Sequence, residues 1–480
     1  MNKLWTIIGI SLYVAVLLWS IVSMSWSVSL LLALSPLLLR NVMSSAFCVL
    51  IPFSLFNSGL FVPNLPGQFQ VYQLWMMIYV GLCVMKVAIH KRMLIDLLRF
   101  DSLCALFMIG WIVLLMWIRG AGMRILGSSQ HGGAVYIQTV FALCFYFFTM
   151  QESLPLRKVR LAGIWMGLLA LLPLLANGVF ELSGGQIRHQ MYFFRTGAAS
   201  AVGASSFLAG QESRLSFMSF GSALLWVGLF ASGANGHRQF AKWCWWAVAG
   251  VCSVLSGFRS TVLGVFSFFV AYGVFTCRRK WFFSVLGLLC GVAIYALAVV
   301  YARSMPFAVQ RVLSMVPGVE VSWKAEVHGR ATMLWRRELW SRARNDVSRY
   351  WLLGRGVTFT AGETVMPVGV VDGFRVAYVT GAFHQATLEL LILYGLPFLM
   401  ACLGFYIYTL HTIRKACYGP MGGIGLEKQY YLIGLWLYCG LRTGLAFAGG
   451  SSDELLVELP VYLAMFHLVR NAQMDHEDVG

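Results

Sequence analysis

Residues 381–410, GAFHQATLELLILYGLPFLMACLGFYIYTL, decide how the chain is interpreted, because a polar loop ends here and an apolar segment begins. The loop spans residues 302–383 and carries eleven Lys and Arg residues against six Asp and Glu residues. His384 stands at the point where the chain re-enters the apolar phase. A basic loop that ends in a histidine beside apolar segments favours a site for an anionic, lipid-borne substrate.

The composition is that of a membrane protein. Of 480 residues, 59% are hydrophobic and only 11% are charged, whereas a soluble globular chain carries about 25% charged residues. Apolar runs recur along the chain, and a helix of roughly 17–25 apolar residues crosses about 30 Å of hydrocarbon. A helix also satisfies its own backbone hydrogen bonds inside lipid. We therefore predict an all-α polytopic membrane protein with about 12–14 transmembrane helices and one large loop.

The expected helices fall on both sides of this loop. The chain divides into an N-terminal transmembrane helix bundle (1–301), the large loop (302–383), and C-terminal transmembrane helices with a short cytoplasmic tail (384–480). Fourteen helices are expected, near 4–22, 26–39, 43–62, 70–89, 101–118, 134–150, 159–180, 213–233, 240–257, 260–277, 281–301, 385–410, 429–448 and 454–469.

Basic residues in the short loops predict the orientation. Cytoplasmic loops are enriched in Lys and Arg, whereas loops longer than roughly 60 residues escape this rule. Both termini are then cytoplasmic and the long loop faces outward. The net charge of +17 reflects the same enrichment and does not indicate nucleic-acid binding. The basic set, which alternates with less basic loops, comprises Arg40, Lys91, Arg92, Arg99, Arg157, Lys158, Arg160, Arg238, Lys242, Arg278, Arg279, Lys280, Arg414, Lys415 and Lys428.

The eleven cysteines are scattered singly. None lies in the long loop and none forms a C-x-x-C pair. We interpret them as small buried hydrophobic residues, and we expect neither a disulfide framework nor a metal site.

The stretch from His328 to Gly356 predicts an amphipathic helix within the loop. Arg330, Arg337 and Arg344 recur every seven residues and share one face. Tryptophan on one side and arginine on another suit a membrane interface, so this basic face either anchors lipid headgroups or binds a ligand. LLGRG then ends the helix at Gly354 and Gly356. The apolar stripe comprises Trp335, Leu339, Ala343, Val347 and Trp351, and the other arginines are Arg336, Arg342 and Arg349.

Three residues on the predicted outer face suggest a chemistry. Arg259 lies between two expected helices, Arg330 lies in the loop and His384 ends it. Taken singly, Arg259 is typical of a topology anchor and His384 of an interfacial histidine. Together they fit a reaction, because guanidinium groups match phosphate oxygens and histidine accepts protons near neutral pH. The set indicates transfer from a phosphate-activated donor to a hydroxyl acceptor.

The order of these motifs resembles the O-antigen ligase and O-antigen polymerase superfamily. The matching elements span about residues 256–400 and include S-G-x-R at Ser256–Arg259 and G-R at Gly329–Arg330. Trp335 is displaced by one position from the family's pattern. L-L-G-x-G follows at residues 352–356, and H-x-x-x-L-x-L-L-x-x-x-G runs from His384.

The resemblance implies glycan transfer from undecaprenyl pyrophosphate at the periplasmic face of the bacterial inner membrane, with inversion and without metal or cofactor. The long loop is then periplasmic. The resemblance also implies that Arg259 and Arg330 bind the pyrophosphate and that His384 activates the acceptor hydroxyl. Gln385 stands where asparagine is common in the family. Further substrate-binding candidates are Trp335, Arg337, Arg344, Arg355, Gln385, Arg188 and Arg195.

The distribution of acidic residues on the predicted outer side fits a metal-independent reaction. The first outer loop, SIVSMSWS, has no carboxylate, whereas metal-dependent membrane oligosaccharyltransferases resemble one another in having acidic residues there. We interpret the other outward carboxylates as solvated loop charges. They are Glu363, Asp372, Asp453 and Glu454.

Three acceptors and one rival function stay open at this point. A lipid-core sugar would make the protein a ligase, and a second lipid-linked chain would make it a polymerase; a protein acceptor is the third case. The rival is a flippase or exporter of lipid-linked oligosaccharide. Polar residues within the expected helices are sparse and no internal repeat is evident, and both observations weigh against transport.

Overall fold

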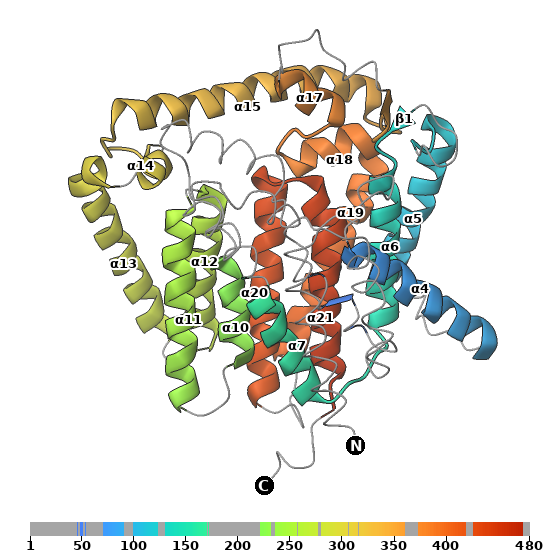
Figure 1. Cartoon of the computed structure of the whole chain (residues 1–480), viewed down its shortest axis with the longest axis horizontal. Helices are drawn as coiled ribbons and strands as arrows, with labels where there is room; N and C mark the ends of the chain where they lie inside the picture. Colours follow the sequence, from blue (N-terminus) through green and yellow to red (C-terminus); the bar gives the residue numbers. More distant parts are fainter. Residues whose placement is uncertain are drawn as a thin grey trace, which may run out of the picture.

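The computed structural model describes residues 46, 49–50, 53, 71–90, 99–122, 130–169, 171, 221–231, 236–256, 258–276, 280–305, 307–314, 316–360, 373–418 and 426–473. Helices form nearly all of its regular structure (Figure 1). In chain order the elements are α4 (Val71–His90), α5 (Phe100–Arg119), β1 (Gln130–His131), α6 (Ala134–Thr149), α7 (Leu156–Leu169), α10 (Leu224–Ala231), α11 (Gly236–Leu255), α12 (Arg259–Thr276), α13 (Lys280–Tyr301), η4 (Ala302–Ser304), α14 (Phe307–Leu313), α15 (Trp323–Tyr350), β2 (Phe359–Thr360), α17 (Gly373–Thr380), α18 (Ala386–Tyr394), α19 (Leu396–Tyr418), α20 (Leu426–Gly449), the π-helix η5 (Glu454–Glu458) and α21 (Leu459–Asn471).

Among the described residues, four segments are long and apolar enough to cross a membrane: Phe100–Arg119, Gly287–Ser304, Leu396–Tyr418 and Glu427–Gly449. The predicted helical class is thus confirmed for the described residues, where the only ladder is the two-residue pairing of β1 with β2. The helices expected at 4–22 and 26–39 lie outside the described residues, as does most of 43–62. The total of 12–14 helices therefore stays a prediction.

The centre of the bundle is α21. Every residue from Leu459 to Val469 is buried, and a helix that is buried on all sides has no need of an amphipathic pattern. Helices α6, α7 and α20 pack against it. Helices from the N-terminal and C-terminal halves of the described chain therefore share one core.

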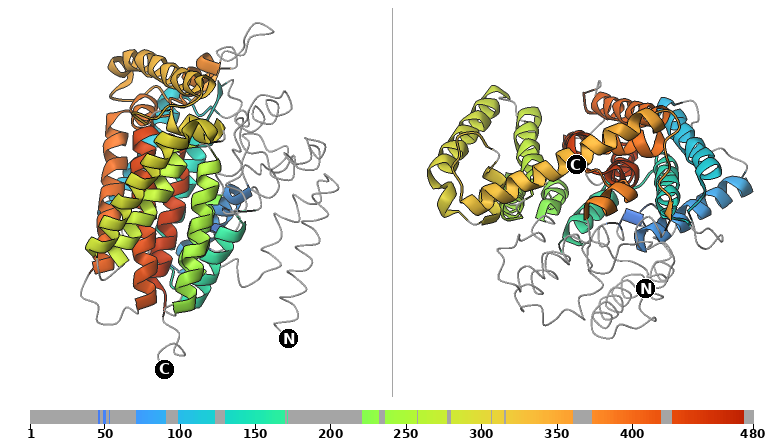
Figure 2. Two further views of the ribbon diagram at one scale, coloured as in Figure 1. Left: turned by 90° about the vertical axis from the view of Figure 1, so that its left-hand side faces the viewer. Right: turned by 90° about the horizontal axis from the view of Figure 1, so that it is seen from above.

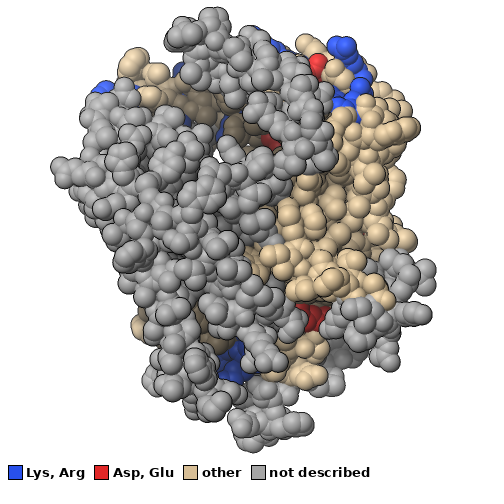
Figure 3. All heavy atoms as spheres, turned by 45° about the vertical axis from the view of Figure 1, so that its right-hand side comes forward, with Lys and Arg blue, Asp and Glu red and all other residues tan. Residues whose placement is uncertain are grey.

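The outer helices present apolar side chains to their surroundings. On α5, Phe107, Val113 and Trp117 are exposed, and on α19 Met400 and Ile407 are exposed. Figure 3 shows a broad band of uncharged atoms beneath the charged atoms at the upper edge of the molecule. An exposed apolar band of this kind suits contact with hydrocarbon.

Helix α15 lies across one end of the bundle, which we call the α15 end (Figures 1 and 2). The predicted amphipathic helix is confirmed, but most of its apolar stripe does not face lipid. Leu339 and Ala343 are fully buried in a cluster with Phe383 and Ile392. Packing on α17 and α18 therefore covers most of this stripe, while Trp351 is exposed.

The prediction of one continuous helix over 385–410 is wrong, because the chain breaks at Gly395. This glycine has φ 86°, and a Cβ there would lie 2.3 Å from the carbonyl oxygen of Leu352. The segment that follows α15 passes too close for any side chain. The predicted helix end at LLGRG is confirmed, since Gly354 and Gly356 have φ values of 73° and 85°.

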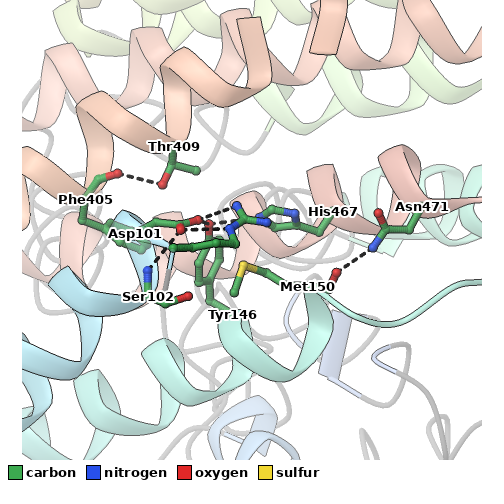
Figure 4. Close-up of polar contacts among 9 residues, drawn as sticks. Asp101, Ser102, Tyr146, Met150, Phe405, Thr409, His467 and Asn471 are labelled. Carbon is green, nitrogen blue, oxygen red and sulfur yellow. Dashed lines mark hydrogen bonds and ion pairs between the residues drawn. The ribbon is translucent and has the colours of Figure 1, made fainter. Parts of the chain in front are cut away.

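The opposite end of the bundle holds a buried polar cluster (Figure 4). Arg99 makes a two-pronged ion pair with Asp101, at 3.1 Å and 2.7 Å. The Tyr146 hydroxyl donates to Asp101 at 2.9 Å and lies 3.0 Å from His467 Nε2. A buried carboxylate is tolerated when it is paired and hydrogen-bonded. This cluster joins α5, α6 and α21. Buried polar residues are therefore more prominent in these helices than we predicted from the sequence.

Candidate functional site

A cavity of about 420 Å³ lies at the α15 end, between α12 and α20. Small-ligand sites typically have volumes of about 300–1,000 Å³, so the cavity suits a headgroup. Its lining combines apolar residues with basic and acidic ones, contributed by segments far apart in the sequence. They are Ser222, Leu225, Phe258, Ser260, Thr261, Gly264, Val265, Phe268, Arg336, His384, Tyr438, Leu441, Arg442, Leu445, Gly449, Gly450, Ser451 and Glu454.

His384 lines this cavity from the short loop between α17 and α18. Its φ of 54° makes it the one non-glycine residue of the described chain with positive φ. The left-handed region costs free energy for such a residue, and the surroundings must hold it there. Trp340 Nε1 donates to the Phe383 carbonyl at 2.8 Å, and the His384 N–H donates to Glu389 at 2.9 Å. Helices α15 and α18 thus fix the histidine's backbone.

Glu389 joins the two loops that line the cavity. One carboxylate oxygen accepts the His384 N–H, and the other accepts the Ser452 N–H at 2.5 Å. The side chain is buried, and burial raises the pKa of Glu389 to about 7. Glu389 was not predicted from the sequence. Its signal was a single carboxylate in the apolar run LELLILY, where burial demands partners.

The electrostatics around His384 favour its neutral form. Partial desolvation beside the cavity, and then the charge of Arg336, lowers the pKa of His384 below its usual value. Burial also lowers the pKa of Arg336. The Trp335 ring lies beside the imidazole, with centroids 5.8 Å apart. A neutral imidazole accepts a proton, which is the role predicted for this histidine.

The arginine that α15 directs into the cavity is Arg336. Arg330 is not among the lining residues; its side chain is 77% exposed and pairs with Glu326 at 2.5 Å. The two arginines are six positions apart, and about 600° of helical rotation, or about 240° beyond a full turn, places them on different faces. From the sequence, Arg336 was only one of the further arginines of the amphipathic helix.

The other predicted residues of α15 and its surroundings are dispersed. Arg337 and Arg344 are exposed and do not line the cavity. Gln385 precedes α18, and its carbonyl accepts the Glu389 N–H at 3.0 Å. Arg355 Nη2 donates to the carbonyls of Tyr378 and Val379, at 2.8 Å and 2.9 Å. These bonds tie the segment after α15 to α17.

Arg259 is the first residue of α12, and its neighbours Phe258 and Ser260 line the cavity. Its side chain lies outside the described residues. Arg188 and Arg195 also lie outside them. The S-G-x-R motif therefore borders the same cavity as His384. From the sequence, the motif and the histidine were only expected to lie on the same face of the membrane.

Two charged residues of the cavity were not expected. Arg442, on α20, was not singled out at all, and Glu454 was interpreted as a solvated loop charge. The second interpretation is wrong: Glu454 lines the cavity and lies 3.9 Å from Arg442 Nη2. Glu458 pairs with the same Nη2 at 3.0 Å. Within the described chain, no three or more His, Cys, Asp or Glu residues are grouped to hold a metal ion.

No family model matches the chain and no curated protein matches it.

Proposed function

We propose that the protein transfers a glycan from undecaprenyl pyrophosphate to a sugar hydroxyl, with the α15 end facing the periplasm of a bacterial inner membrane. The observation that carries the proposal is the shared cavity of His384 and Arg336, bordered by the start of α12. A proton acceptor, a cation and an apolar wall are the groups that such a reaction needs.

His384 acts as the general base in this scheme. The acceptor hydroxyl oxygen attacks the anomeric carbon of the donor sugar, and its proton passes to the imidazole. The bond from that carbon to the pyrophosphate oxygen breaks, and its electron pair leaves with undecaprenyl pyrophosphate. Attack from the side opposite the leaving group inverts the anomeric carbon. Because the pKa of His384 is lowered, the imidazole is ready to accept a proton at neutral pH.

Arg336 stabilises the negative charge of the departing pyrophosphate. A guanidinium group presents paired N–H donors that match phosphate oxygens. Among the described residues Arg336 makes no ion pair, so its charge is available to a ligand. Arg259 is the second candidate for this role, by its place at the start of α12. Arg330 becomes the less favoured candidate because it pairs with Glu326.

The acceptor separates a ligase from a polymerase. Both enzymes take the same donor through the same step, and they differ in whether the hydroxyl belongs to a lipid-core sugar or to another lipid-linked glycan. We favour the ligase. The supporting chemistry at His384 and Arg336 is common to both.

The test uses purified full-length protein in detergent with an undecaprenyl-pyrophosphate glycan, EDTA and separate acceptors. Transfer to a lipid-core acceptor, lost in His384→Ala, is the expected result. Lengthening of the donor glycan alone would establish a polymerase.

A matched control is Arg342→Gln, which removes an arginine of α15 that is exposed and paired with Glu338. Arg336→Gln should lower transfer much more than this control. No transfer to any acceptor, with tight donor binding retained, would refute the proposal and favour transport. Full activity of His384→Ala would remove the histidine from the mechanism.

A further inference from the structure

An arginine of α20 lines the same cavity, within a helix apolar and long enough to cross a membrane. Arg442 is half-buried there and belongs to the segment Glu427–Gly449. Ionisable residues inside such helices are costly, face cavities or partners, and mark functional sites. We therefore expect Arg442 to have a functional role in addition to packing.

Its two carboxylate partners bind it unequally. Glu458 accepts a hydrogen bond from Nη2 at 3.0 Å. Glu454 lies at 3.9 Å from the same atom, which is too long for a hydrogen bond. A guanidinium has five N–H donors, so Arg442 keeps donors for a ligand. Glu454, which also lines the cavity, keeps acceptor capacity on its oxygens.

The backbone around Glu454 is also unusual. Residues Glu454–Glu458 form a π-helix. Single π-turns inside helical segments are rare in proteins overall, and those that occur are often found at functional sites. This turn places both carboxylates beside Arg442. The pairing is thus built by the local fold.

The charges on the two sides of the cavity differ in kind. Arg442 with Glu454 and Glu458 carries one positive and two negative charges, so the group does not attract a pyrophosphate. Arg336 has no ion-pair partner among the residues that the structure describes. A neutral, hydroxyl-bearing ligand suits the Arg442–Glu454 side, because it needs one donor and one acceptor close together. Tyr438 and Phe268 add aromatic surface to the lining.

We propose that Arg442 and Glu454 form a subsite for sugar hydroxyls, separate from the phosphate-binding side at Arg336. Arg442 donates to a hydroxyl oxygen and Glu454 accepts a hydroxyl hydrogen. The inference rests on the proposed function only for the kind of ligand, a glycan. The sugar comes either from the donor or from the acceptor.

The experiment measures binding separately from transfer. Full-length protein in nanodiscs is titrated by calorimetry with undecaprenyl pyrophosphate, with the same lipid carrying a glycan, and with the lipid-core acceptor. Glu454→Gln, which disturbs only the longer contact, should weaken one glycan-bearing ligand by about tenfold or more, since a hydrogen bond to a charged group is lost. Affinity for bare undecaprenyl pyrophosphate should stay within about twofold of wild type. The ligand that is weakened identifies the source of the sugar.

Arg336→Gln is expected to weaken both pyrophosphate lipids, and Glu338→Gln, at an exposed pair on α15, to weaken none. Arg442→Gln is the second variant, with its folding checked by thermal unfolding. Unchanged affinities of Glu454→Gln for both glycans would overturn the subsite, as would an equal loss for bare lipid. If wild-type protein transfers nothing yet Glu454→Gln still loses glycan affinity, the proposed transfer fails and the subsite stands.

Discussion

Glu389→Gln tests how the cavity is assembled. The carboxylate accepts the N–H groups of His384 and Ser452, at 2.9 Å and 2.5 Å. Glutamine keeps one oxygen acceptor and turns an NH₂ group toward the other N–H. A hydrogen bond to a charged group contributes about 1.5–3 kcal/mol. We expect the variant to release one of the two loops by weakening this contact, without an equal loss of global stability, because a neutral amide avoids the cost of burial that raises the pKa of Glu389 to about 7.

The consequence for the proposed glycan transfer follows from the position of His384. Its φ of 54° is held by neighbouring hydrogen bonds. We call the pair of hydrogen bonds that Glu389 accepts from His384 and Ser452 the clamp. The backbone of His384 is expected to relax when one of these bonds is lost. A displacement of about 1 Å near reacting groups costs on the order of 100-fold in rate. We expect the kcat for glycan transfer to fall about 10- to 100-fold, while the Kd for undecaprenyl pyrophosphate changes little. Wild-type kcat in Glu389→Gln would refute the clamp.

The same variant changes the dependence of stability on pH. The pKa of Glu389 is about 7 in the folded protein, raised by burial from an ordinary 4.5. The folded state therefore holds the proton more tightly, so stability is greatest below pH 4.5 and falls as pH rises to about 7. The difference in pKa corresponds to at most roughly 3 kcal/mol. Thermal unfolding in detergent between pH 4.5 and 7 should show this slope in wild type and in Glu338→Gln, but a smaller one in Glu389→Gln. Equal slopes would contradict the prediction.

Three further predictions concern other contacts. In Arg336→Gln the pKa of His384 should rise toward its usual value, because a neighbouring positive charge is removed; NMR titration of the imidazole measures this, and an unchanged pKa would show that burial alone lowers it. Gly395→Ala should lower the melting temperature, because the added Cβ would lie 2.3 Å from a backbone oxygen at a φ that alanine disfavours; wild-type melting would contradict the close approach. Asp101→Asn should destabilise the protein by about 3 kcal/mol, since a partly buried Arg99 loses its partner; unfolding of the variant at the wild-type temperature would refute this.

Much of the helical structure was predictable from apolar runs alone. The segments expected at 101–118, 134–150, 260–277 and 281–301 correspond to α5, α6, α12 and α13, within a few residues at each end. Each run satisfies its backbone hydrogen bonds locally. The amphipathic helix of the long loop was predictable for the same reason, since its periodic pattern depends only on neighbours along the chain.

The helix break and the clamp were not predictable in this way. Gly395 interrupts an apolar run because the segment after α15 passes within contact distance of it. Glu389 bonds to Ser452, which lies 63 residues away. Neither contact leaves a periodic signal in the sequence.

The sequence by itself determined the helical class, the apolar segments, the amphipathic loop helix and the histidine that ends the loop. Only the tertiary structure decided which charged residues meet that histidine. Arg336 lines the cavity and Arg330 does not, because packing of α15 on α17 and α18 turns one face of the helix toward the bundle. Arg442 and Glu454 line the same cavity because α20 packs against both α12 and η5 only in the folded chain. Helix formation depends on local hydrogen bonds and hydrophobicity, whereas a site depends on the directions in which distant faces are packed.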